Sequence, residues 1–216
     1  MSETLSDDPC KLYLLTPPQI DPAAFAPLLE RTIAAQPEIV GAVQLRLKNV
    51  GDDDFTRAAE QLRPVCHGFD LPLIINDRPD IAAATGCDGV HIGQDDADYS
   101  EARKLLGPDG IIGVTCHASR DLAIEAGEQG ADYVAFGAFF PSASKEVKHH
   151  AEPEIIEIWS EMTTLPCVAI GGITAENCAP LVAAGANYLA VIGCIWNHPE
   201  GPEAGVRAFT ERLVRS

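Results

Sequence analysis

Gly130-Ala131-Asp132-Tyr133-Val134 decides the fold, because the same punctuation recurs twice elsewhere in the chain. The other copies are Gly86-Cys87-Asp88-Gly89-Val90 and Gly185-Ala186-Asn187-Tyr188-Leu189, and each copy follows an alanine-rich, helix-like stretch. A glycine that ends a helix, an Asp or Asn turn and a short apolar strand together make an αβ connection. The repetition predicts alternating helices and strands, and therefore a parallel βα architecture.

Eight short apolar stretches around these anchors are predicted as strands, at residues 12–15, 42–47, 72–75, 89–92, 111–115, 133–136, 167–170 and 188–192. Eight helical patterns accompany them; the first starts at Asp21-Pro22 and the last ends near Arg215. At about 27 residues per unit, eight βα units are enough for a compact (βα)8 TIM barrel of the α/β class. A doubly wound open sheet is the alternative, although no GxGxxG motif follows the first strand.

Composition and charge limit the protein class. Of the 216 residues, 46% are hydrophobic, which indicates a globular domain; we expect a single domain with a short, flexible, acidic N-terminus over about residues 1–10. A net charge of −17 disfavours nucleic-acid binding, and no apolar run approaches the ~18 residues of a membrane span. The seven cysteines are dispersed without a CxxC motif, so we expect a reducing, cytoplasmic location.

Cations are scarce in this acidic chain, so the place of each is informative. In the second strand, period-two alternation puts Gln44, Arg46 and Lys48 on one face and Val43, Leu45 and Leu47 on the other. We expect the polar face to look into the barrel mouth. Both faces of a covered parallel sheet are shielded from water, so two cations there need an anionic partner.

Carboxylates and amides follow the third and fourth strands. The third strand ends in Asn76-Asp77-Arg78, and Asp95-Asp96 comes shortly after the fourth. Carboxylates that converge beside a cationic strand suggest Mg²⁺, which binds a few carboxylates together with substrate phosphates. Alternatively, Asp77 caps the helix that follows it. We interpret His91, in the fourth strand, as a packed and hydrogen-bonded histidine rather than a metal ligand.

Hydroxyls, a lysine and glycines follow the later strands. Ser142-Ala143-Ser144-Lys145 suits a phosphate, and Gly171-Gly172 and Ile192-Gly193 allow backbone amides to approach an anion. Phosphate sites of barrels often lie in these last loops. We interpret Cys116 as structural and His149-His150 as surface residues.

Five motifs together resemble the thiamine phosphate synthase family in order and spacing. They are Gln44-Leu45-Arg46-Leu47-Lys48, Asn76-Asp77-Arg78, the stretch from Asp88 to Asp96, Ser142-Ala143-Ser144-Lys145 and Ala169-Ile170-Gly171-Gly172-Ile173. The resemblance covers nearly the whole chain. It implies a (βα)8 barrel that joins a hydroxymethylpyrimidine diphosphate to a thiazole phosphate, with Mg²⁺ as cofactor and loss of diphosphate before a pyrimidine carbocation is captured.

The resemblance also implies roles for individual residues. Asp77 and Asp96 would bind the metal, while Arg46, Lys48 and Lys145 would act as catalytic cations on the leaving diphosphate. The pyrimidine diphosphate would be held by Gln44, Leu45, Arg46, Leu47, Lys48, Asn76, Thr115 and Lys145, and the thiazole phosphate by Ser142, Ala143, Ser144, Gly172, Ile192 and Gly193.

Two positions depart from the family pattern. Gly193 stands where serine is frequent, which removes one hydroxyl from the thiazole phosphate side, and Leu47 stands where glutamate is frequent.

Two other functions are considered. A thiazole tautomerase, which could use His117, is the alternative enzyme, and a noncatalytic phosphate-binding barrel is the third interpretation. Expected partners are the two small-molecule substrates, with no nucleic acid and no membrane, and the sequence leaves a homo-oligomer open.

Overall fold

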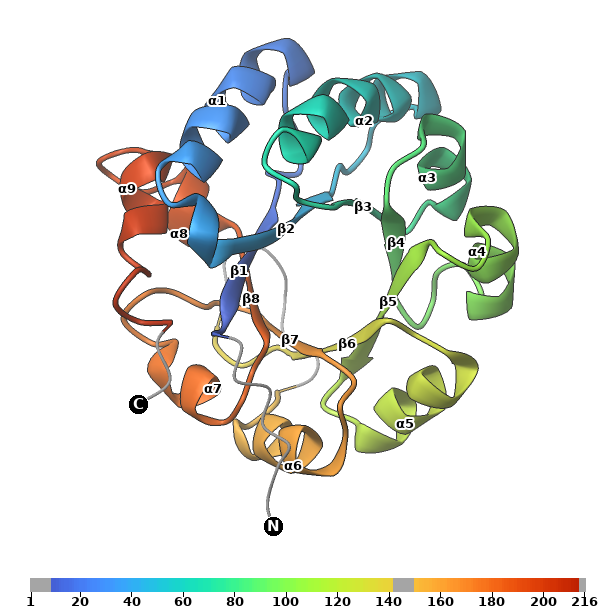
Figure 1. The fold of residues 1–216 in the computed structure, drawn as a ribbon, viewed down its shortest axis with the longest axis vertical. Coiled ribbons are helices and arrows are strands. Elements are labelled where there is room, and N and C mark those ends of the chain that lie inside the picture. The colour runs from blue at the N-terminus through green and yellow to red at the C-terminus, as the bar shows by residue number, and fades with distance from the viewer. Residues whose placement is uncertain (1–8, 142–149, 214–216) are drawn as a thin grey trace.

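A computed structural model describes residues 9–141 and 150–213, in which eight parallel strands close into one barrel in the order of the chain (Figure 1). The predicted TIM barrel is confirmed, and each strand begins and ends within two residues of its predicted bounds. The predicted flexible N-terminus falls mostly outside the described residues. The strands are β1 (Lys11–Leu15), β2 (Val40–Leu45), β3 (Leu73–Asn76), β4 (Gly89–Ile92), β5 (Ile111–His117), β6 (Tyr133–Gly137), β7 (Cys167–Ile170) and β8 (Tyr188–Val191).

Helices surround the barrel on its outer side (Figure 1). The described residues contain nine α-helices rather than the eight predicted, because a short additional helix follows β8. The expected end of the last helix near Arg215 is wrong: that helix ends at Arg207 and turns follow it. The helices are α1 (Pro22–Ala34), α2 (Asp52–His67), α3 (Pro79–Thr85), α4 (Tyr99–Leu106), α5 (Arg120–Gln129), α6 (Glu154–Met162), α7 (Ala179–Ala183), α8 (Gly193–Trp196) and α9 (Pro202–Arg207), with a 3₁₀ helix, η1 (Pro37–Ile39).

The repeated glycine and Asp or Asn motif makes the same connection at each of its three places. The glycines end or follow a helix with a left-handed backbone, with φ of 64° at Gly86 and 96° at Gly130. The Asp or Asn then accepts a hydrogen bond from the first or second backbone amide of the preceding strand. The bonds are Leu73 N to Asp88 (2.8 Å), Ile112 N to Asp132 (2.8 Å) and Cys167 N to Asn187 (2.9 Å).

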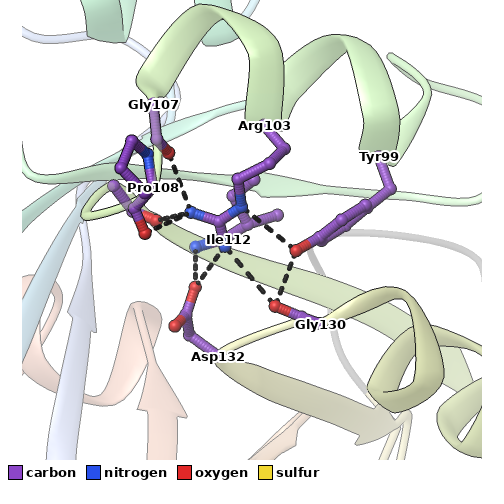
Figure 2. A network of polar contacts seen from close by, with 8 residues as sticks. Tyr99, Arg103, Gly107, Pro108, Ile112, Gly130 and Asp132 are labelled. Carbon is purple, nitrogen blue, oxygen red and sulfur yellow. Dashed lines mark hydrogen bonds and ion pairs between the residues drawn. The ribbon is translucent and has the colours of Figure 1, made fainter.

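The side chain of Arg103, in α4, connects the end of α4 with the end of α5 and the start of β6. These contacts lie at the end of the barrel where the strands begin (Figure 2). Its guanidinium donates to the carbonyl of Gly107 at 3.1 Å and to the carboxylate of Asp132 at 2.9 Å. Tyr99, from the same helix α4, donates to the carbonyl of Gly130 at 2.6 Å. This network satisfies backbone groups at the helix ends and belongs to the frame of the barrel, away from the carboxyl ends of the strands.

The strand side chains alternate between two separate layers of core. Outward-facing residues such as Leu14 and Val43 pack with the helices, whereas Tyr13, Ile74 and Tyr133 fill the inside of the barrel. Small interior residues make room for the large ones: the ring of Tyr133 occupies the space where a Cβ of Gly113 would stand. Substituting Gly113 by any other residue would therefore displace Tyr133 from the interior.

Strand β2 ends two residues earlier than predicted, and this changes the place of two cations. The backbone N–H of Arg46 donates to Thr16 Oγ1 at 2.9 Å, and that of Lys48 donates to the carbonyl of Pro18 at 2.9 Å. The chain therefore leaves the sheet after Leu45 and follows the loop between β1 and α1. Only Gln44 of the predicted polar face lies within the strand.

None of the helices in residues 9–141 and 150–213 is long and apolar enough to cross a membrane.

The seven cysteines all lie in the described residues, and none of them forms a disulfide. Burial raises the pKa of the Cys116 thiol to about 12, which fits its interpretation as a structural residue.

Candidate active site

The predicted site residues within the described chain gather at the carboxyl ends of the strands. Gln44 is the second-last residue of β2, Asn76 is the last of β3, and Thr115 lies in the last half of β5. Leu45 is the last residue of β2, Gly193 is the first residue of α8, and the others lie in the loops after β2, β3, β4, β7 and β8. This end of a TIM barrel holds the active site, because the βα loops that carry functional side chains meet there.

Asp77 and Asp96 lie side by side at this end, although they are 19 positions apart in the chain. Burial and the neighbouring carboxyl of Asp96, which also shares a side-chain hydrogen bond with Asp77, raise the pKa of Asp77 to about 6. The charge of Arg46 and a hydrogen bond from Asn76 lower the pKa of Asp77 and so oppose this shift. In that bond the Asn76 amide donates to Asp77 Oδ2 at 2.5 Å. The loops after three strands thus bring two carboxylates and a guanidinium together.

The alternative that Asp77 caps the next helix is wrong. Helix α3 has Arg78 at its N-cap position and no side-chain capping hydrogen bond there. Asp77 instead adopts a left-handed backbone with φ of 62°, and its N–H donates to the carbonyl of His91 at 2.8 Å. Aspartate tolerates this conformation better than most residues, so the turn holds the carboxylate at the mouth of the barrel.

Asp96 reaches the mouth through a tight loop after β4. Its Oδ2 accepts a hydrogen bond from the backbone N–H of Gly93 at 2.8 Å. The same oxygen would lie 2.5 Å from a Cβ at Gly93, so a side chain at that position would push the carboxylate away. The glycine after β4 is therefore part of the geometry that presents Asp96.

The two cations after β2 differ in their exposure to solvent. Arg46 is half-buried, and burial lowers the pKa of its guanidinium while Asp77 opposes that shift. An arginine keeps its charge at neutral pH despite such a shift, so a poorly hydrated cation lies beside the carboxylates. Lys48 is exposed. Leu45 and Leu47 pack into the outer core, so their side chains point away from Gln44.

A buried chain of hydrogen bonds crosses the interior beneath these charges. Gln44 Nε2 donates to the Tyr13 hydroxyl at 3.1 Å, and the hydroxyls of Tyr13 and Tyr133 lie 2.8 Å apart. His91 Nδ1 lies 3.0 Å from the Tyr133 hydroxyl, and its Nε2 lies 2.8 Å from Thr115 Oγ1. The interpretation of His91 as a packed, hydrogen-bonded residue is confirmed.

Sequence reasoning missed Tyr13 and Tyr133, the two central members of this chain of hydrogen bonds. Each stands in a short apolar strand and was counted as part of the hydrophobic pattern. Period-two alternation, applied to β1 and β6 as it was to β2, would have put both rings inside the barrel. Their hydroxyls, once buried, need hydrogen-bond partners, which is the signal that could have found them.

Gly172, Ile192 and Gly193, which are predicted to hold the thiazole phosphate, lie after β7 and β8. Gly172 has φ of 63°, and a Cβ there would meet the backbone of Phe140 and Pro141. Asn177 fixes this loop because its Nδ2 donates to the Gly172 carbonyl at 2.9 Å. Ile192 is the N-cap residue of α8, and Gly193 is the exposed first residue of that helix. The predicted residues Ser142, Ala143, Ser144 and Lys145, and His149, lie outside the described residues.

Comparison with known proteins agrees with this geometry. Residues 12–195 match the sequence profile of the family described as thiamine monophosphate synthase. A thiamine-phosphate synthase of Rhodospirillum centenum is 58% identical over 206 residues, covering 95% of this chain and 98% of the relative. One from Erythrobacter litoralis is 47% identical over 216 residues, covering 99% of each. A solved thiamine phosphate pyrophosphorylase from Pyrococcus furiosus matches with a TM-score of 0.81 and 26% identity, covering 94% of this chain and 95% of that one. The chain belongs to the thiamine phosphate synthase family.

Proposed function

We propose that this chain carries out the synthase reaction with the residues gathered at the barrel mouth. The reaction joins a hydroxymethylpyrimidine diphosphate to a thiazole phosphate, forms thiamine phosphate and releases diphosphate. The observation that carries the assignment to this site is the convergence of Arg46, Asp77 and Asp96 from the loops after three strands. A leaving diphosphate needs positive charge, and this is where a cation and two metal-binding carboxylates lie together.

The donor set of this cluster fits Mg²⁺. Asp77 and Asp96 supply two neighbouring carboxylates, and no group of three or more His, Cys, Asp or Glu side chains that could hold a metal ion is found in the described ranges. Mg²⁺ is commonly bound by one or two carboxylates, substrate phosphates and water, and this pair meets that requirement. The raised pKa of Asp77 reflects burial beside a second carboxyl, which a divalent cation would relieve. When bound, Mg²⁺ supplies positive charge to the diphosphate.

Arg46 stabilises the negative charge that grows on the diphosphate as the carbon–oxygen bond breaks. Because the guanidinium is half-buried, less water screens its interaction with a phosphate than at an exposed site. Fixed charges of this kind need no rearrangement during the reaction. Lys48, in the same loop, and Lys145 add further positive charge in this proposal.

The chain holds the two substrates in line and needs no general base. Gln44, Asn76 and Thr115 hold the pyrimidine at the carboxyl ends of β2, β3 and β5. The loops after β7 and β8 hold the thiazole phosphate through Gly172 and Gly193. Loss of diphosphate leaves a pyrimidine-stabilised carbocation, and the thiazole nitrogen captures it with its own lone pair, so juxtaposition of the two rings is the main requirement.

Product analysis tests this proposal. The chain is incubated with both phosphorylated substrates and Mg²⁺, and mass spectrometry should find thiamine phosphate and diphosphate in equal amounts. Arg46→Gln should lower kcat by about 10²-fold, as expected for loss of a preorganised charge. Arg57→Gln, an exposed position on α2 that pairs with Asp54, serves as the control and should leave kcat unchanged. Isomerisation of the thiazole without condensation would overturn the proposal in favour of a tautomerase.

A further inference from the structure

The hydrogen bonds that cross the barrel interior have a direction, because each member has few protons to give. The amide nitrogen of Gln44 only donates, so the Tyr13 oxygen accepts at that end. The single hydroxyl hydrogen of Tyr13 then goes to Tyr133, its other partner, and that of Tyr133 goes to His91 Nδ1. In this arrangement the hydroxyls of Tyr13 and Tyr133 both donate and accept, so neither of these two O–H groups is left without an acceptor.

The direction decides the tautomer of His91. The ring is buried, and a ring nitrogen that accepts a hydrogen bond carries no proton, so an imidazole whose Nδ1 accepts from Tyr133 is neutral and has a single N–H. With Nδ1 accepting from Tyr133, that hydrogen is on Nε2, 2.8 Å from Thr115 Oγ1. The threonine oxygen is therefore an acceptor toward the barrel interior. Reversing the Gln44 amide would reverse the direction of every hydrogen bond in turn. Whether Thr115 accepts from His91 or donates to it is therefore coupled to an amide four hydrogen bonds away.

Thr115 keeps its own hydroxyl hydrogen for a ligand. The side chain is only partly buried, and within residues 9–141 and 150–213 its hydroxyl group has His91 as its single hydrogen-bond partner. We infer that His91, held as the Nε2–H tautomer by Tyr133, is a positioning residue that turns the Thr115 hydroxyl into a hydrogen-bond donor toward the pyrimidine diphosphate substrate. This inference rests on the proposed function, which makes Thr115 a contact of that substrate.

A fixed donor differs from an ordinary threonine, whose hydroxyl rotates to suit its neighbours. Without Tyr133, the histidine could also carry its hydrogen on Nδ1 and accept from Thr115, and the substrate would lose its donor. The bond to the substrate is similar before and during the reaction, so its loss should raise the KM for the pyrimidine diphosphate and leave kcat and the thiazole phosphate KM nearly unchanged.

The tautomer is measured first, on the unsubstituted protein. Long-range ¹H–¹⁵N correlation spectra of the imidazole rings distinguish the two tautomers, and a His91→Gln variant assigns the His91 signals by their loss. We expect hydrogen on Nε2 in the parent protein and a mixture of tautomers in Tyr133→Phe. Hydrogen on Nδ1 in the parent protein would overturn the inference. This readout needs no catalysis, so it remains decisive even if the synthase assay fails and the proposed function with it.

The second measurement is a set of double mutants that asks whether Tyr133 acts through Thr115. Tyr133→Phe should raise the pyrimidine diphosphate KM about tenfold with Thr115 or Thr115→Ser present, the size expected for one lost hydrogen bond. In Thr115→Val, which has no hydroxyl to orient, the same change should matter less than about twofold. Tyr99→Phe, which removes a tyrosine hydroxyl at the opposite end of the barrel, where it donates to the carbonyl of Gly130, is the control. An equal effect of Tyr133→Phe in all three backgrounds would show a merely structural role and refute the positioning role.

Discussion

Replacing Asp77 by asparagine should stabilise the metal-free protein while it removes a proposed metal ligand. Burial and the Asp96 carboxyl raise the pKa of Asp77 from 3.8 to about 6, so the folded state binds this proton more tightly than the unfolded chain does. The charged carboxylate therefore destabilises the fold increasingly as the pH rises from 3.8 to about 6, and to its full extent above that. An asparagine keeps the shape, accepts the same bond from Asn76 and tolerates the left-handed φ of 62°.

The magnitude follows from the shift in pKa. A shift of about two units corresponds to about 3 kcal/mol at pH well above 6, at 1.36 kcal/mol per unit. Asp77 is partly open to solvent at the mouth, so screening reduces the expected gain in unfolding free energy to about 1–2 kcal/mol at pH 7.5. As the pH falls from above 6 toward 3.8, the wild-type carboxylate becomes protonated and its destabilising charge is lost. The gain in unfolding free energy should therefore shrink to about half at pH 5.

Urea denaturation in the presence of EDTA, at pH 7.5 and pH 5, measures this difference. Asp95→Asn, an exposed carboxylate in the same loop as Asp96, is the control and should change the unfolding free energy by less than about 0.5 kcal/mol. Added Mg²⁺ should stabilise the parent protein and the control but not Asp77→Asn, because a ligand stabilises only the state that binds it. An Asp77→Asn protein that is less stable than its parent in EDTA at pH 7.5 would refute the reasoning.

Three further predictions concern catalysis. Asp96→Asn should keep the fold and weaken Mg²⁺-dependent turnover; an unchanged magnesium titration would remove Asp96 from the metal site. Gly193→Ser should lower the KM for the thiazole phosphate by adding a hydroxyl, since among the described residues a Cβ there meets only Asn197 Nδ2, at 3.6 Å; an unchanged KM in steady-state kinetics would contradict this. Lys145→Ala should lower kcat about 10²-fold, whereas Ser142→Ala should mainly raise the thiazole phosphate KM, because only the lysine meets charge that grows in the transition state. Varying each substrate separately distinguishes these two effects.

The sequence by itself determined the architecture and the end of the barrel that carries the site. Gly86, Gly130 and Gly185 end or follow helices, and short apolar strands begin a few residues after them, so a linear pattern was enough to find these connections. Parallel strands put all their carboxyl ends on one side, and this placed the motifs after β2, β3 and β4 together without any knowledge of distances.

Only the tertiary structure decided how those residues act on one another. The early end of β2 depends on hydrogen bonds to Thr16 and Pro18, which belong to a different loop. The raised pKa of Asp77 depends on its closeness to Asp96. The hydrogen bonds that lead from Gln44 to Thr115 join side chains of five strands through Tyr13 and Tyr133. Such contacts are set by the closure and stagger of the barrel, which determine the interior side chains that meet across it, and no local pattern of residues carries that information.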